Sequence, residues 1–218
     1  MRKIVAIDGP AGSGKGTIAK LVAEKCNLLY IDSGATYRSV ALAILENNID
    51  INDEESVVKL AKSLDIKFDN GKTYLNGIDV SDKIRNKEVS EIVSFVSNNV
   101  KLRSILVELQ RNMAKTNDVI MEGRDITTVV FPDAKYKFYL DADLYERAER
   151  RYKQNQENNI DMSFDEIVEN IKKRDNNDMN KPVGALRRTD EQVYIDSTNM
   201  TIEEVFEKIF EIIMREDK

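Results

Sequence analysis

The feature that most constrains this chain is a glycine-rich segment near its start, GPAGSGKGT at residues 9–17. It directly follows a short apolar run and leads into a helical pattern, and its Gly9, Gly14 and Lys15 fit the spacing GxxxxGK. Glycines let the backbone wrap closely round a phosphate, while the helix N-terminus and the lysine add positive charge. The segment predicts a phosphate-binding loop made of Gly9, Pro10, Ala11, Gly12, Ser13, Gly14, Lys15, Gly16 and Thr17.

Short apolar runs alternate with longer helical patterns along the whole chain. The runs read as buried parallel strands, and they are Lys3–Asp8, Leu28–Asp32, Val119–Glu122, Lys135–Asp141 and Val193–Asp196. Near the end, TIEE at 201–204 is a capping box, and six apolar residues of 201–215 form one helical stripe: Ile202, Val205, Phe206, Ile209, Phe210 and Ile213. This alternation predicts an α/β fold, a P-loop NTPase-type parallel sheet flanked by helices.

Two segments depart from the alternation. Residues 65–84 alternate with period two and carry Asn-Gly turn signals at 70–71 and 76–77, which predicts a small antiparallel β insert. Residues 143–180 read as two charged helices with a polar joint at 154–161, and the second begins with the capping box SFDE at 163–166. This pattern indicates a mobile helical lid. We therefore expect one P-loop domain over 1–218, with an insertion at 34–100 that contains the β unit and with the lid at 143–180.

Composition narrows the chemistry. The chain has 218 residues and no histidine, which removes the usual neutral-pH acid/base, the Ser/Cys–His triads and most zinc sites. Its 33 basic and 39 acidic residues give a net charge of −6, which argues against coating nucleic acid. No apolar stretch is long enough to span a membrane, and the single Cys26 cannot form an internal disulfide. We expect a cytoplasmic monomer that performs phosphate chemistry.

One detail of the loop bears on its metal. Gly16 follows Lys15 where a Ser or Thr usually holds Mg²⁺, and Thr17 comes one place later, as in nucleoside monophosphate kinases. In this variant the metal should depend more on phosphates, waters and a strand-end carboxylate. Our candidates for metal ligands are Thr17 and Glu122, although Glu122 could equally be a structural strand-end carboxylate.

Polar residues after the second and third strands indicate a second anion site. Ser33 and Arg38 follow one strand, and Arg124 and Asp125 follow the next. In α/β folds the carboxyl ends of parallel strands meet at the ligand-binding edge. An arginine there suits a phosphate, because its planar fork binds two oxygens. Two arginines beside a phosphate loop therefore predict an acceptor that itself carries phosphate.

The motifs together resemble the bacterial cytidylate kinase family over essentially the whole chain. The segments that carry the resemblance occur in the family's order: DGPAGSGKGT, DSGATYR, LNGIDVSDKIR, EGRDITTVVFPDA and KRDNNDMNK. The resemblance implies a kinase domain over 1–218 in which the insertion at 34–100 binds the nucleoside monophosphate substrate. It also implies ATP as phosphoryl donor, Mg²⁺ as cofactor, and CMP and dCMP as small-molecule substrates. The implied reaction transfers the γ-phosphoryl group to a phosphate that is already ionised, so no general base is needed.

The family's roles carry over residue by residue. Ser33, Arg38 and Arg124 match its acceptor-phosphate contacts, while Ser94, Arg103 and Asp125 match the positions that read cytosine. Arg174 and Asp178 match positions at the ribose, and Lys181 one on the acceptor phosphate. The catalytic set implied by the resemblance is Lys15, Arg124, Arg150 and Arg151. On the residues alone, Arg150 and Arg151 also fit a solvated helix with the i,i+4 pairs Asp143–Arg147, Glu146–Arg150 and Glu149–Lys153.

Three positions depart from the family pattern. Lys181 replaces the usual arginine, so a point charge replaces a bidentate fork, and Arg187 or Arg188 could compensate. Thr127 stands where the pattern has glycine, which could tighten the acceptor pocket. The segment PVGALRR at 182–188 replaces a Ser-Pro-Leu form.

Other functions remain open on the residues alone. A kinase for UMP, dTMP or a shikimate-type hydroxyl acceptor would reuse the same loop, and a hydroxyl acceptor would need Asp32 or Asp125 as its base. A guanine-nucleotide switch would want an NKxD segment, whereas Asn180-Lys181 is followed by Pro-Val. A nucleic-acid-binding module lacks a basic–aromatic pattern.

Overall fold

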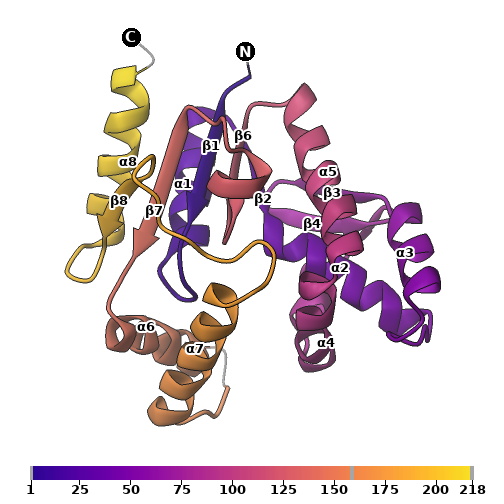
Figure 1. The fold of residues 1–218 in the computed structure, drawn as a ribbon. Coiled ribbons are helices and arrows are strands. Elements are labelled where there is room, and N and C mark those ends of the chain that lie inside the picture. Colours follow the sequence, from indigo (N-terminus) through magenta and orange to yellow (C-terminus); the bar gives the residue numbers. More distant parts are fainter. Residues whose placement is uncertain (1, 158–159, 217–218) are drawn as a thin grey trace.

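The computed structural model describes residues 2–157 and 160–216. Its centre is a five-stranded parallel sheet in the order β2-β6-β1-β7-β8 (Figure 1). The strands are β1 (Ile4–Asp8), β2 (Leu29–Asp32), β6 (Val119–Gly123), β7 (Tyr136–Asp141) and β8 (Val193–Asp196). All five predicted strands are confirmed, with bounds that differ by a residue at most. The first strand is central, which brings the loop after it between the ends of β6 and β7.

Helices cover both faces of the sheet. Val5 and Ile7 of β1 pack in one core with α1 (Lys15–Cys26) and α8 (Ile202–Glu216). Ala6, on the opposite side of the same strand, belongs to the core under α2 (Ser33–Glu46) and α5 (Val100–Thr116). The two-residue alternation of a strand therefore builds two cores from one buried run.

The predicted stripe of the last helix is correct except at its first member. Val205, Ile209 and Ile213 are buried against the sheet, whereas Ile202 is 52% exposed. Ile202 is the first residue of α8, directly after Thr201, which accepts a hydrogen bond from Glu204 N at 3.2 Å. The capping box is confirmed, and the first turn that it fixes lies beyond the core.

The small β unit is confirmed as a separate antiparallel sheet, in the order β3-β4-β5. Its strands are β3 (Ile66–Asp69), β4 (Lys72–Leu75) and β5 (Ile78–Asp79). Both Asn-Gly pairs have positive φ, 47° and 73° at 70–71 and 50° and 82° at 76–77, the geometry of a two-residue type I′ hairpin turn. The insert also contains α3 (Glu54–Ser63), a 3₁₀ turn η1 (Lys83–Arg85) and α4 (Lys87–Asn98). Its apolar residues are continuous with the α2–α5 core.

The predicted lid consists of α6 (Leu144–Glu157) and α7 (Phe164–Met179). They lie beside each other below the sheet (Figure 1) and share a small core of Ala148, Ile167, Val168 and Ile171. The Ser163 capping box is confirmed, with Glu166 bonding back to it. The predicted polar joint at 154–161 is wrong in part, because residues 154–157 belong to α6 and Asn155 is buried; residues 158–159 lie outside the described part.

No helix among the described residues combines the length and the apolar character that crossing a bilayer requires.

Candidate active site

The phosphate loop connects β1 to α1 at the carboxyl edge of the sheet. Gly14 caps α1 with φ at 88°, and Lys15 begins the helix. The Lys15 side chain is 4% exposed, and its Nζ donates to Pro10 O at 2.7 Å and to Ser13 Oγ at 3.3 Å. Burial, followed by the positive charge of Arg124, lowers the pKa of Lys15 to about 7. A buried ammonium next to an arginine is arranged to receive an anion.

Glu122 explains why residue 16 is glycine. A Cβ on Gly16 would lie 3.1 Å from Glu122 Oε1, so the carboxylate occupies the space that a Ser or Thr side chain would need. Glu122 Oε1 also accepts from Tyr30 OH at 3.3 Å. Burial, followed by the negative charge of Asp32, raises the pKa of Glu122. Thr17, the other candidate metal ligand, is exposed on the first turn of α1. No group of three acidic, Cys or His side chains gathers as a metal site in residues 2–157 and 160–216.

Arg38 and Ser33 meet at the start of α2. Asp32 caps this helix through Ala35 N at 3.1 Å and binds Arg38 Nη2 at 2.6 Å, so both oxygens of the carboxylate are used. Ser33 is buried, and its Oγ would lie 2.4 Å from a Cβ on Gly123 at the end of β6. Arg38 Nε is buried and has no hydrogen-bond partner among the described residues. This arginine therefore retains a donor after its ion pair with Asp32.

Arg103 and Asp125, two of the positions that the resemblance assigns to reading cytosine, form a buried ion pair. Arg103 is 4% and Asp125 6% exposed. Arg103 Nη1 donates to Ser97 O at 3.2 Å. Gly184, with φ at +67°, lies so close that a Cβ there would overlap Arg103 Nη2 at 1.9 Å. The glycine in the unusual PVGALRR segment thus makes room for the guanidinium.

Ser94, the third predicted base-reading residue, lies on the neighbouring helix α4. Its side chain is exposed, and its carbonyl accepts from Ser97 Oγ at 3.2 Å. Ser94 is therefore linked to Arg103 only through Ser97 in this structure.

Asp178 lies between two cations on the lid side of the site. Its Oδ2 accepts from Arg124 Nε at 2.7 Å, and its Oδ1 lies 3.0 Å from Lys181 Nζ. Burial would raise the pKa of Asp178, but Arg124 and Lys181 outweigh it and hold the pKa below its usual range. Arg188, a predicted substitute for an arginine at 181, instead stacks on Tyr194 with its Cζ 3.9 Å from the ring centroid.

Arg174 projects from α7 toward the same region. Desolvation in the cleft, followed by the charge of Arg124, lowers its pKa to about 10. Arg38 and Arg151 act on it in the same direction. The mutual repulsion of these arginines marks a place that is electrostatically suited to phosphate groups.

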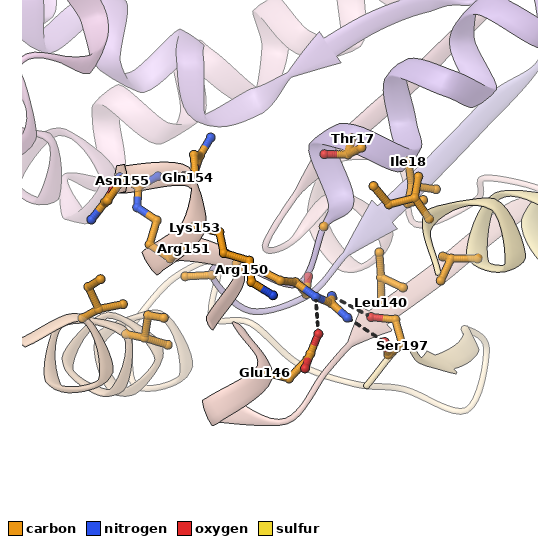
Figure 2. Close-up of a pocket in the computed structure, with 18 of the residues that line it drawn as sticks. Thr17, Ile18, Leu140, Glu146, Arg150, Arg151, Lys153, Gln154, Asn155 and Ser197 are labelled. Atoms are coloured by element: carbon orange, nitrogen blue, oxygen red, sulfur yellow. Dashed lines mark hydrogen bonds and ion pairs between the residues drawn. The ribbon is translucent and has the colours of Figure 1, made fainter. Parts of the chain in front are cut away.

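The lid helix α6 carries two further arginines beside a cavity of about 760 Å³. Figure 2 shows Arg150 bridging Glu146 and Ser197, with Nε–Oε1 at 3.0 Å and Nη2–Ser197 O at 2.7 Å. Arg151 is exposed, and its Nη1 donates to Gln154 Oε1 at 2.8 Å. The phosphate loop including Thr17, helix α7 and the start of α8 also contribute to its lining. It is large enough for a nucleotide.

The i,i+4 pairs on α6 are confirmed for Glu146–Arg150 and Glu149–Lys153. The predicted pair Asp143–Arg147 is wrong. Arg147 is buried and binds Asp175 of α7 at 2.7 Å, because its side chain points into the molecule rather than along the exposed face of the helix.

Asp8 is a site residue that sequence reasoning left without a role. It is fully buried at the end of β1, directly before Gly9, and accepts from Ile126 N and Thr127 N, both at 2.8 Å. Thr127 Oγ1 donates to Asp8 as well and accepts from Gln192. Asp8 thereby joins the phosphate loop to the π-helical turn η2 (Ile126–Val130), which begins directly after Asp125. The available signal was that Asp8 is an acidic residue closing a buried strand.

Thr127 is expected from the sequence to tighten the acceptor pocket. In the structure the Thr127 hydroxyl instead donates to Asp8 and accepts from Gln192.

A family model described as cytidylate kinase matches residues 5–215. A cytidylate kinase of Fusobacterium nucleatum is 48% identical, with 93% of each chain covered. That of Bacillus subtilis is 39% identical, with 98% of this chain and 97% of the relative covered.

Solved structures of remote relatives share the fold. A protein of Eubacterium ventriosum superposes with a TM-score of 0.54 at 11% identity, covering 97% of this chain and 98% of its own. A shikimate kinase of Bacteroides thetaiotaomicron gives 0.50 at 13% identity, with 97% and 98% covered.

Proposed function

The chain belongs to the cytidylate kinase family, and we propose that it transfers the γ-phosphoryl group of ATP to CMP or dCMP, giving CDP or dCDP. The observation that carries the assignment of chemistry is the cluster of cations around one sheet edge. Arg124 and Arg174 both lower the pKa of Lys15, and Arg124 and Arg38 lower the pKa of Arg174, between a phosphate loop and the predicted lid.

The donor side uses the phosphate loop and the cavity beside it. Loop N–H groups and the N-terminus of α1 bind the phosphates, and Lys15 turns from its Pro10 contact toward the β/γ-phosphates. Arg150 and Arg151 line the same cavity from the lid. We assign to both arginines the stabilisation of the negative charge that develops on the transferred phosphoryl group. For this, Arg150 first breaks its contacts with Ser197.

The acceptor side uses the strand ends of β2 and β6. The phosphate of CMP is bound by Ser33, Arg38 and Arg124. We assign Lys181 to the same phosphate, because Lys181 and Arg124 both bind Asp178. The pair Arg103–Asp125 reads cytosine together with Ser94, because the base offers an amino donor and two acceptors. Asp178 and Arg174 lie at the ribose. The phosphate of CMP is largely ionised at neutral pH, with a second pKa of about 6, so the nucleophile needs no base.

Mg²⁺ fits the residues present at the end of β6. Glu122 is a half-buried carboxylate with a single phenol bonded to it, and Mg²⁺ is commonly held by one or two carboxylates plus substrate phosphates and water. Glu122 and Thr17 would hold the ion, which when bound neutralises charge on the β- and γ-phosphates.

Two alternatives are less well supported. A hydroxyl acceptor of the shikimate type needs a free carboxylate base, but Asp32 is bound to Arg38 and Ala35 N, and Asp125 is bound to Arg103. UMP and dTMP would place a carbonyl where cytosine has its amino group, opposite the acceptor oxygens of Asp125. Cytoplasmic location and a monomeric state stay predictions.

The test is ADP production from ATP·Mg²⁺ with CMP, dCMP, UMP, AMP, GMP, dTMP and shikimate, each offered separately. We expect strong turnover with CMP and dCMP alone. Slow ATP hydrolysis without turnover of any of these acceptors would agree with the assigned donor site and contradict the acceptor assignment.

A further inference from the structure

Two lid side chains hold Ala11 of the phosphate loop by its backbone. The N–H of Ala11 donates to Asp175 Oδ1 at 3.2 Å, and its carbonyl accepts from Arg147 Nη1 at 2.8 Å. Arg147 Nη1 also lies 2.7 Å from Asp175 Oδ2. One residue of the loop is thus enclosed by a guanidinium from α6 and a carboxylate from α7, which are themselves paired.

The surroundings of this arrangement make it rigid. Arg147 is 6% and Asp175 8% exposed, so water competes little for their hydrogen bonds. Arg147 Nε is fixed separately by Ala142 O at 2.9 Å, directly after β7. The backbone of α6 is also close, because a Cβ on Gly12 would lie 3.4 Å from the carbonyl oxygen of Arg147. A buried, charge-assisted contact with a planar fork fixes geometry as well as adding free energy.

We propose that Arg147 and Asp175 are positioning residues, which hold the phosphate loop in the shape that binds the phosphates of ATP. They act through Ala11 and are separate from the residues assigned to phosphate contact. With both polar groups of Ala11 directed to the lid, the N–H groups of residues 13–17 are the ones presented to phosphate. The same contacts hold the first turn of α6 and the C-terminal part of α7 against the end of the sheet.

The test compares nucleotide affinity with acceptor affinity. In Arg147→Met we expect the Kd and KM for ATP to rise about tenfold, the usual consequence of losing a charge-assisted hydrogen bond, while the KM for CMP stays within about twofold. Arg147→Lys restores the charge without the fork, so we expect an intermediate rise. Glu149→Gln is the matched control, because it breaks the exposed Lys153–Glu149 pair on the same helix and should change neither constant.

A purely structural role predicts a different pattern. Equal changes in the constants for ATP and CMP, or an unchanged Kd for ATP, would overturn the proposal. Arg147→Met leaves Asp175 buried without its cation and could prevent folding. The double variant Arg147→Met/Asp175→Asn removes both charges while keeping an acceptor for Ala11 N–H, and the same rise in the Kd for ATP is expected from it.

The inference rests on the proposed function only for the identity of the acceptor. ATP binding is titrated without any acceptor, whereas the proposed function is tested by turnover. If the wild-type chain binds ATP but leaves CMP unphosphorylated, the acceptor assignment fails, and the response of the variants still decides the role of Arg147 and Asp175.

Discussion

Arg124 Nε donates to Asp178 Oδ2 at 2.7 Å, a bond that joins the segment after β6 to the last turn of α7. The two residues are 54 positions apart in the sequence. The bond links the end of α7, a helix of the predicted lid, to an arginine that we propose binds the acceptor phosphate. Each proposed role below depends on contacts of this kind.

Replacing Lys15 by methionine should abolish turnover while leaving the unliganded protein folded. The pKa of Lys15 is lowered to about 7, so the unfolded chain binds more protons than the folded one between pH 7 and its usual value near 10.5. Stability of the wild type therefore rises with pH across that window. We expect the variant to have the higher Tm at pH 7 and the difference to shrink toward pH 10, as followed by thermal unfolding. Near-normal activity in the variant would contradict the assignment of residues 9–17 as the phosphate-binding loop.

ATP binding should weaken above neutral pH for the same reason. Phosphate groups favour the charged form of Lys15 and raise its pKa on binding, so binding takes up a proton above pH 7. We expect the Kd for ATP to increase by up to about tenfold per pH unit between pH 7.5 and 9. Equilibrium titration measures it, with the Lys15→Met variant as control. A Kd that is constant over this range contradicts the assigned role of Lys15.

Asp125→Ala should weaken CMP more than ATP. The substitution removes a base-reading carboxylate and leaves Arg103 buried without its partner, which costs about 3–5 kcal/mol of unfolding free energy. Steady-state kinetics with each substrate varied in turn, alongside urea unfolding, separate the two effects. Glu54→Ala, which breaks the exposed Lys101–Glu54 pair, serves as the control. Equal losses for both substrates would argue against base reading.

Lys181→Arg should leave the KM for CMP unchanged or lower it. Lys181 lies 3.0 Å from Asp178 with 14% of its side chain exposed, and an arginine can keep this pair while offering a second donor to phosphate. The KM for CMP at saturating ATP is the measurement. A large increase would show that Lys181 is not at the acceptor phosphate.

Thr127→Val should destabilise the protein more at pH 7.5 than at pH 4.5. Burial raises the pKa of Asp8 to about 6, against the Thr127 hydroxyl and the backbone N–H groups that lower it. The folded state therefore binds more protons between pH 4 and 6, and Asp8 contributes less stability as pH rises through this window. Losing the Thr127 hydroxyl raises the cost of burying the ionised Asp8 carboxylate. We expect the free energy of unfolding at pH 7.5 to fall by about 1–3 kcal/mol.

Urea unfolding at the two pH values tests this, and Thr127→Ser, which keeps the hydroxyl, should resemble the wild type. An equal loss at both pH values would mean that Thr127 does not stabilise the Asp8 carboxylate.

Short stretches of the sequence predict those parts of the molecule whose structure depends on residues close along the chain. The phosphate loop, the strands, the Asn-Gly turns and the capping boxes at Ser163 and Thr201 were all predicted. Each of these is produced by backbone preference or by hydrogen bonds within about four residues, so its signal is complete in a short stretch of chain. The family resemblance added candidate site residues but no geometry.

The pairing of site residues that are far apart in the sequence is visible only in the folded structure. Asp175 binds Ala11 across 164 positions, and Asp8 binds Thr127 across 119. Arg147 was expected to pair with Asp143 and instead binds Asp175, because the packing of α6 on α7 turns its side chain inward. The sheet order β2-β6-β1-β7-β8 brings distant strand ends to one edge, and burial there makes ion pairs specific. Such contacts have no short-range signal, since they depend on where whole elements lie.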